Sequence, residues 1–393
     1  MIKEKRFDQK FDDIRIIDIP VPDEIFMPVY EFAGNKKLIE GTGINEYEEI
    51  VPGIYSPVHG EIRENSKIPV NGIESDVVRI SVSAPVKRKT KYEEDNISDL
   101  SVKVILKRLE KCELYIEPES FNENEIIVSA VETDPHCAVF QQLIRENPDD
   151  LDECFSFLKK IFNKDNIYFA VPENIFDLVW ELQTSGVTIY KVSPFYPNGL
   201  PELLINSMSG RYKLKSPVYI TIEEVLNALK VIKTDKPCLD KVITLTDKNG
   251  TSNLRVIKGT SFKEILKNSD IRKIKKVIIG GPLRGYANYN LNSPVTDKTD
   301  SVYVQYEDEV IRAINNQCIN CGRCNNICPT SLTVNLLCRY SEFSIFEKCK
   351  DLDVENCIEC GLCAYYCPAG RSLLQLIRLA KNEIEQLEGE IES

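Results

Sequence analysis

The chain has 393 residues, of which 42% are hydrophobic and 28% charged, and its formal net charge is −12. This length predicts several domains, and this balance is typical of globular rather than disordered chains. The negative charge argues against nucleic acid as a partner, because binding to phosphates depends on clustered lysine and arginine. No apolar run is long enough to cross a bilayer, and the amino terminus lacks the apolar stretch of a secretory signal, so we expect a cytoplasmic protein.

Residues 1–85 are predicted to form a small β domain. Alternating segments at 18–21 and 77–82 predict short strands, and the glycines between 41 and 72 predict tight turns between strands. The charged and polar stretch 87–98 that follows is typical of a linker or an exposed loop.

Residues 100–215 alternate between strand and helix patterns. The compact apolar runs 126–131 and 168–171 suit buried strands, and 187–192 is predicted to be another strand, whereas 151–162 and 173–184 have helical periodicity. This alternation predicts a Rossmann-like α/β layer.

Residues 216–300 are predicted to form a smaller α+β unit. Two β runs flank the turn 247–251, and a helix at 261–268 and a strand at 276–279 follow them. The rest of the chain is predicted to be mostly helical, and its end, 372–388, carries an apolar stripe at helical spacing.

Eight of the 14 cysteines fall in two short runs, Cys318–Cys328 and Cys357–Cys367. Both runs read C-x2-C-x2-C-x3-C-P, the spacing of two adjacent four-iron, four-sulfur (4Fe-4S) clusters. In such pairs the first three cysteines of a run bind one cluster and the fourth binds the other. We therefore assign cluster 1 to Cys318, Cys321, Cys324 and Cys367, and cluster 2 to Cys357, Cys360, Cys363 and Cys328.

Structural zinc is the main alternative for these cysteines. Zinc sites usually combine two C-x2-C pairs, or cysteine with histidine over long intervals. Three cysteines in one short loop, occurring twice and each time followed by Cys-Pro, favour iron–sulfur clusters instead. The helix-like stretch 332–349 between the runs indicates a helical ferredoxin-type domain rather than a compact β-containing ferredoxin.

The other six cysteines are expected to pack in cores. Cys338 and Cys349 lie between the two runs without motif spacing, so packing is favoured over a redox role. His136 beside Cys137 offers a thiol with its base, but a buried thiol at a helix start is the favoured interpretation. The remaining cysteines are Cys112, Cys154 and Cys238.

Two further segments add to the cysteine runs, namely Gly280–Gly285 (GGPLRG) and Ser56–Gly60 (SPVHG). With these two segments and the two cysteine runs, in the order in which they occur, the chain resembles the C subunit of the Rnf electron-transport complex over nearly its whole length. Residues 132–135 (ETDP) occupy the place of that family's Glu-Cys-Glu-Pro segment. Residues 196–199 (YPNG) occupy the place of its Tyr-Pro-x-Gly segment.

The resemblance implies four domains in a multidomain α+β and α/β chain. Residues 1–85 would be a barrel-sandwich-type β domain, and 100–215 a degenerate Rossmann-like α/β domain. Residues 216–300 would be a β-grasp domain of the soluble-ligand-binding type, and 305–393 a helical dicluster ferredoxin-type domain.

One departure from the family concerns its flavin. The family carries a Gly-Gly-Ala-Gly-Phe-Pro loop that cradles the FMN phosphate, and the matching region is near 109–122. No glycine occurs anywhere in 73–185. Such a cradle needs backbone N–H groups that no Cβ obstructs. The sequence therefore predicts that FMN is absent, and we assign no catalytic residue.

These observations favour a non-catalytic subunit that relays single electrons through two 4Fe-4S clusters. The expected donor is a flavoprotein or a ferredoxin, and the expected acceptor is a reductase or an Rnf-type complex. Peripheral association with the inner face of the membrane stays open. Two alternatives remain, namely an FMN-dependent NADH or ferredoxin oxidoreductase of Rnf type, and a structural subunit whose clusters only stabilise the fold.

Overall fold

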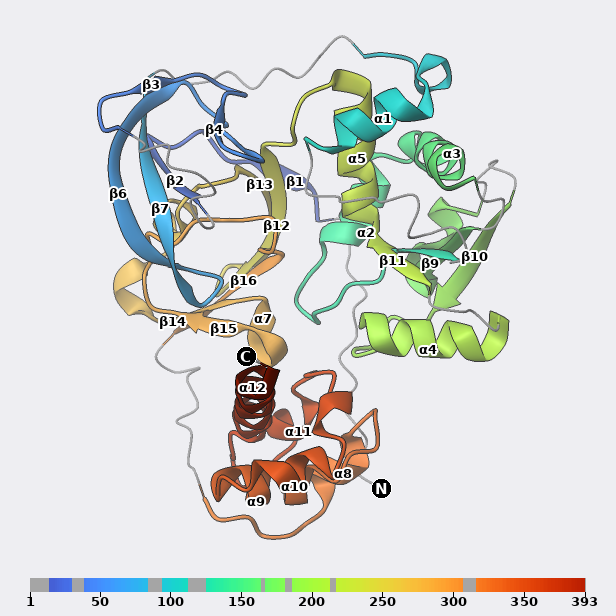
Figure 1. Cartoon of the computed structure of the whole chain (residues 1–393), viewed down its shortest axis with the longest axis vertical. Coiled ribbons are helices and arrows are strands. Elements are labelled where there is room, and N and C mark those ends of the chain that lie inside the picture. Colours follow the sequence, from blue (N-terminus) through green and yellow to red (C-terminus); the bar gives the residue numbers. More distant parts are fainter. Residues whose placement is uncertain are drawn as a thin grey trace. The chain divides into compact units, whose positions relative to one another are not determined.

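A computed structural model describes residues 14–29, 39–83, 94–111, 125–163, 167–180, 186–212, 217–306 and 316–392. The chain divides into two compact units (Figure 1). Unit 1 comprises Met1–Gly281 and Tyr286–Glu307, and unit 2 comprises Pro282–Gly285 and Asp308–Ser393. As predicted, the chain is a multidomain α/β protein with several sheets. Among the described helices, none has the length and hydropathy to cross a membrane.

The amino-terminal part of unit 1 is an antiparallel sheet in the order β2-β7-β6-β3, with a separate β4-β5 pair. Asn71 and Gly72 connect β6 to β7, both with positive φ, as a two-residue hairpin of primed type requires. Buried Ile25 and Ile80 lie in the core of this sheet. The strands are β2 (Glu24–Pro28), β3 (Gly43–Ile44), β4 (Glu49–Val51), β5 (Ile54–Tyr55), β6 (Gly60–Val70) and β7 (Ile73–Val82).

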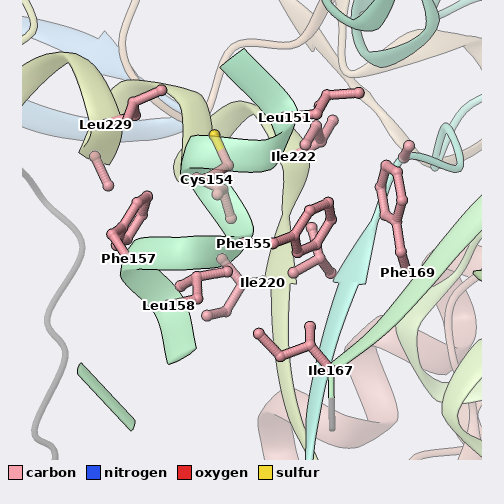
Figure 2. Packing of buried hydrophobic residues seen from close by; sticks show 14 of the residues in the cluster. Leu151, Cys154, Phe155, Phe157, Leu158, Ile167, Phe169, Ile220, Ile222 and Leu229 are labelled. Atoms are coloured by element: carbon pink, nitrogen blue, oxygen red, sulfur yellow. The ribbon is translucent and has the colours of Figure 1, made fainter. Parts of the chain in front are cut away.

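The middle of unit 1 is a parallel sheet in the order β10-β9-β8-β11. All four residues of β8 are buried, as expected for a central strand covered on both faces. Figure 2 shows α3 packing its aromatic side chains against β9, β11 and α5. The strands are β8 (Ile126–Ser129), β9 (Ile167–Pro172), β10 (Val187–Val192) and β11 (Val218–Thr221). The helices are α1 (Val102–Leu109), α2 (Val139–Glu146), α3 (Asp150–Phe162), α4 (Pro201–Tyr212) and α5 (Ile222–Thr234).

The α/β layer continues past the predicted boundary at residue 215. β11 pairs in parallel with β8, and Thr221 then starts α5 with a capping box that includes Glu224. The helix predicted at 173–184 is a 3₁₀ helix over Glu173–Leu178 in the part of the chain that is described.

The third part of unit 1 is a sheet in the order β1-β13-β12-β16-β14-β15. β1 belongs here rather than to the amino-terminal β domain, because it pairs in parallel with β13. Ser261 caps α6, which is shorter than the predicted helix. The strands are β1 (Ile16–Asp18), β12 (Asp240–Asp247), β13 (Gly250–Ile257), β14 (Ile274–Ile279), β15 (Tyr286–Asn288) and β16 (Ser301–Tyr306). The helix is α6 (Phe262–Ile265). A further helix, α7 (Gly281–Arg284), has only Gly281 in unit 1, because Pro282–Gly285 belong to unit 2.

Unit 2 is built from helices in its described residues. They are α8 (Arg323–Ile327), α9 (Val334–Glu342), α10 (Phe346–Lys350), α11 (Leu362–Tyr365) and α12 (Leu373–Glu392). The predicted apolar stripe faces the core of this unit from α12, since Leu373, Ile377, Ala380 and Ile384 are buried. Leu387, at the end of the stripe, is 49% exposed.

Candidate metal centre

The loops that carry the two cysteine runs share one backbone conformation. Asn320 and Gly322 have φ of 58° and 71°, and their counterparts Glu359 and Gly361 have 52° and 73°. Left-handed residues alternating with others turn successive backbone N–H groups toward one concavity, a geometry that binds anions and iron–sulfur clusters. At Gly361 a Cβ would lie 2.2 Å from the Leu283 carbonyl oxygen, so only glycine fits there.

The fourth cysteine of each run begins a second repeated turn. The N–H of Ser331 donates to the Cys328 carbonyl at 3.1 Å, and the N–H of Gly370 donates to the Cys367 carbonyl at the same distance. Ser331 and Gly370 both have positive φ. The chain then enters α9 in the first case and α12 in the second.

One cavity of unit 2 brings together thiols from both runs. Its lining includes Cys318, Cys321 and Cys324 of the first run and Cys367 of the second. Burial raises the pKa of Cys324, and the negative charges of Cys318 and Cys367 raise it further. These are the four residues that the spacing assigns to cluster 1.

The other four cysteines also lie near one another. Burial raises the pKa of Cys363 to about 12, and charge on Cys360, Cys357 and Cys328 adds to the effect. Burial likewise raises the pKa of Cys360 to about 11. Thiols with such pKa values stay protonated at neutral pH unless a bound cation compensates the charge of the thiolates. Four thiols gathered in this way are a donor set of the type that binds an iron–sulfur cluster.

The two sets differ in their exposure. Cys318 and Cys321 are exposed, whereas Cys360 and Cys363 are each 7% exposed. A basic side chain lies near each set of cysteines. Lys381 donates to the Cys357 carbonyl at 2.8 Å, and Arg371 lines the cavity of the first set.

Two buried cysteines outside the runs pack in the core of unit 2. The Cys338 thiol donates to the Leu373 carbonyl at 3.5 Å, and the Cys349 thiol to the Leu337 carbonyl at 3.5 Å. Burial raises the pKa of Cys338, and charge on Cys363 and on Cys324 raises it further, so this thiol is close to members of both sets.

The cysteines of unit 1 that are described, Cys137, Cys154 and Cys238, are buried as expected, whereas Cys112 lies outside the described residues. Burial raises the pKa of Cys137 well above its usual value, and burial lowers the pKa of His136. The pair therefore lacks the low thiol pKa of a reactive cysteine.

No three His, Cys, Asp or Glu side chains among the described residues converge at the spacing of a single-ion site.

Sequence reasoning missed a cavity of about 500 Å³ in unit 1. Its wall includes the buried Lys241, which donates to Glu223 at 2.6 Å and to Asp300 at 2.9 Å. Lys241 and Asp300 are 59 positions apart in the sequence, and Glu223 lies on α5, so no local motif signals the three together. The predicted flavin region overlaps residues 112–124, which lie outside the described part of the chain.

The segment 132–135 follows β8. The Glu132 carboxylate accepts hydrogen bonds from the N–H groups of Phe140 at 2.6 Å and Gln141 at 3.2 Å, at the start of α2. Burial raises the pKa of Glu132 to about 8. In this structure the Glu132 side chain therefore anchors α2.

No protein-family model matches the chain. The C subunit of an ion-translocating oxidoreductase complex from Edwardsiella ictaluri is 30% identical over 285 residues, which is 68% of this chain and 36% of that protein. The C subunit of a proton-translocating ferredoxin:NAD(+) oxidoreductase complex from Clostridium ljungdahlii is 24% identical over 412 aligned positions. The alignment covers 93% of this chain and 89% of that protein. The C subunit of the ion-translocating oxidoreductase complex from Methanosarcina acetivorans is 36% identical over 156 residues, which is 39% of this chain and 35% of that protein.

By sequence, the chain resembles the C subunits of Rnf-type ion-translocating oxidoreductase complexes. This agrees with the resemblance drawn from the motifs. The chain spans about a third of the Edwardsiella and Methanosarcina proteins and most of the Clostridium protein. Its relatives are thus named as subunits of ion-translocating oxidoreductase complexes.

Among solved structures, the chain is similar to NAD+-reducing [NiFe]-hydrogenase in the H2-reduced state. The identity is 11% and the TM-score 0.45, with 70% of this chain and 57% of that chain covered. A likeness of this size carries no functional argument.

Proposed function

We propose that the chain relays single electrons through two 4Fe-4S clusters within a multi-subunit redox assembly. Cluster 1 would be held by Cys318, Cys321, Cys324 and Cys367. Cluster 2 would be held by Cys357, Cys360, Cys363 and Cys328. The observation that carries the proposal is the shared cavity of unit 2, where Cys367 joins the three thiols of the other run.

The chain's own residues would position the clusters and limit access of water. The nest-like loops aim backbone N–H groups at each cluster, and such hydrogen bonds to the sulfurs set its potential. When bound, the clusters supply one-electron redox chemistry. The buried set at Cys360 and Cys363 excludes solvent, whereas the exposed Cys318 and Cys321 bring cluster 1 to the surface of unit 2.

A partner would exchange electrons at the exposed cluster 1. Support comes from the relatives, which are named as subunits of oxidoreductase complexes, one of them acting on ferredoxin and NAD(+). We propose a ferredoxin or a flavoprotein as donor, and a reductase or an Rnf-type complex as acceptor. Cytoplasmic location and peripheral membrane association stay predictions.

The test is metal analysis of the anaerobically purified full chain. Two clusters give about eight iron atoms and eight acid-labile sulfides per chain, and dithionite reduction produces the electron paramagnetic resonance (EPR) signals of reduced 4Fe-4S centres. One zinc ion or more per chain, with a colourless solution, would overturn the proposal.

The second candidate is an FMN-dependent oxidoreductase, which the name of the Clostridium relative favours. We propose instead that FMN is absent, because no glycine lies in 73–185 to form a phosphate cradle. Flavin analysis of the same preparation decides between the two. Stoichiometric FMN, or bleaching of the clusters by NADH without an added partner, would establish the second candidate.

A further inference from the structure

Arg371 is a buried cation at the cavity of cluster 1. It follows Gly370 at the end of the second cysteine run and precedes α12. Its side chain is 5% exposed and pairs with the Glu342 carboxylate at the end of α9. The residue lines the same cavity as Cys318 and Cys367.

The guanidinium is only partly satisfied by protein groups. Its Nε is buried and has no hydrogen-bond partner among the described residues. The hydrogen bond to Glu342 is the main cause that raises the pKa of Arg371, and the neighbouring Cys318 sulfur contributes as well. A buried guanidinium with an unpaired N–H is costly, so the site calls for a further acceptor beside it.

The counterpart position in the first run holds no charge. Leu332 follows Ser331 there as Arg371 follows Gly370, and Leu332 is buried in the apolar core of unit 2. Near the other cysteine set, Arg378 lies 2.7 Å from the Glu359 carboxylate and also donates to the Arg284 carbonyl. The arrangement at Arg371 is therefore specific to one of two otherwise similar loops.

We propose that Arg371 is a positioning residue that raises the reduction potential of cluster 1 by donating to its sulfurs and by its fixed positive charge. The inference rests on the proposed clusters. When a redox partner supplies one electron, the cluster gains one negative charge and no bond is broken. A cation at its edge stabilises the reduced form more than the oxidised form, and hydrogen bonds to the sulfurs act in the same direction. Glu342 counteracts part of this effect.

The experiment is an anaerobic redox titration of the full chain, in which EPR follows each cluster during reduction by dithionite. The signal of cluster 1 is assigned by its loss in Cys321→Ser. We expect Arg371→Gln to lower the reduction potential of cluster 1 by at least about 59 mV. For a one-electron couple, this shift is a tenfold change in the ratio of oxidised to reduced cluster at a fixed potential. Arg371→Lys keeps the charge and should shift the potential less.

Two further variants keep the test decisive if Arg371→Gln fails to assemble cluster 1. Glu342→Gln removes the opposing charge and should raise the potential of cluster 1. Arg378→Gln is the matched control, since it removes a paired arginine that does not line this cavity, and it should leave cluster 1 unchanged.

An Arg371→Gln protein with full iron and an unchanged potential would overturn the role of Arg371 and leave the proposed function standing. So would a Glu342→Gln protein whose cluster 1 potential is unchanged or lower. Wild-type protein without iron would instead overturn the proposed function itself.

Discussion

The two cysteine runs have the same spacing and the same backbone but different surroundings. In the first run Cys318 and Cys321 are exposed, whereas Cys360 and Cys363 of the second run are buried. Gly322 has open space around its Cα, but Gly361 faces the Leu283 carbonyl. The comparison teaches that the motif determines how the loop folds. The environment that tunes a cluster comes from residues outside the motif.

The largest expected effect comes from exchanging a fourth ligand. In the proposed assignment each fourth cysteine crosses to the neighbouring cluster, so Cys328→Ser should remove the cluster assigned to Cys357, Cys360 and Cys363. Cys367→Ser should remove the other cluster. Iron should fall by about half in each variant, and EPR shows which signal is lost. If each variant lost the cluster of its own run, the crossed assignment would be wrong.

The next effect distinguishes the two loop glycines. Gly322→Ala should lower the free energy of unfolding by about 1–2 kcal/mol, because the left-handed backbone conformation is strained for alanine. No atom lies close enough to the added Cβ to increase this loss. Gly361→Ala should cost about 2–5 kcal/mol, because overlap with the Leu283 carbonyl adds to this strain. Anaerobic denaturant unfolding of both variants measures the difference. Equal losses would show that the Leu283 contact does not matter.

Exposure should also separate the clusters in their rate of iron loss. Cluster 1, at Cys318 and Cys321, should react with a chelator under mild oxidation several-fold faster than the cluster at the buried Cys360 and Cys363. Stopped samples analysed by EPR follow each signal with time. If both signals decayed at the same rate, exposure would not control the loss of iron. The Cys321→Ser protein is the control, because its remaining signal gives the decay of cluster 2 alone.

Local rules recovered much of this chain from its sequence. Period-two and buried apolar runs located β8, β10, β12 and β13, and the cysteine spacing selected the four cysteines that line one cavity of unit 2. The rules failed where partners are distant in sequence. The pairing of β1 with β13 and the addition of β11 to the parallel sheet depend on long-range hydrogen bonds that no local window contains.

The same limit applies to the surroundings of the candidate site. Arg371, which precedes α12, pairs with Glu342 at the end of α9, and nothing near either residue in the sequence indicates the partner. Lys241 and its two carboxylates likewise come from separate elements. The motifs identify the proposed ligands because the cysteines of each run are close in sequence, whereas the charges that surround these cysteines are brought together by packing.

The smallest expected effect tests whether Cys338 only packs. Cys338 and Cys349 have the same burial and each donates to a backbone carbonyl at 3.5 Å, but only Cys338 interacts with cysteines of both sets. If both residues are structural, Cys338→Ala and Cys349→Ala should each cost about 1 kcal/mol of unfolding free energy, the loss for one small buried group.

Cys349→Ala is then the matched control for a redox role of Cys338. Both variants should keep full iron content, and both cluster potentials should stay at their wild-type values. Suppose that Cys338→Ala alone shifts a potential or slows electron exchange between the clusters, measured by EPR after rapid mixing with a limiting amount of reductant. The thiol near Cys324 and Cys363 would then belong to the electron path rather than to the core.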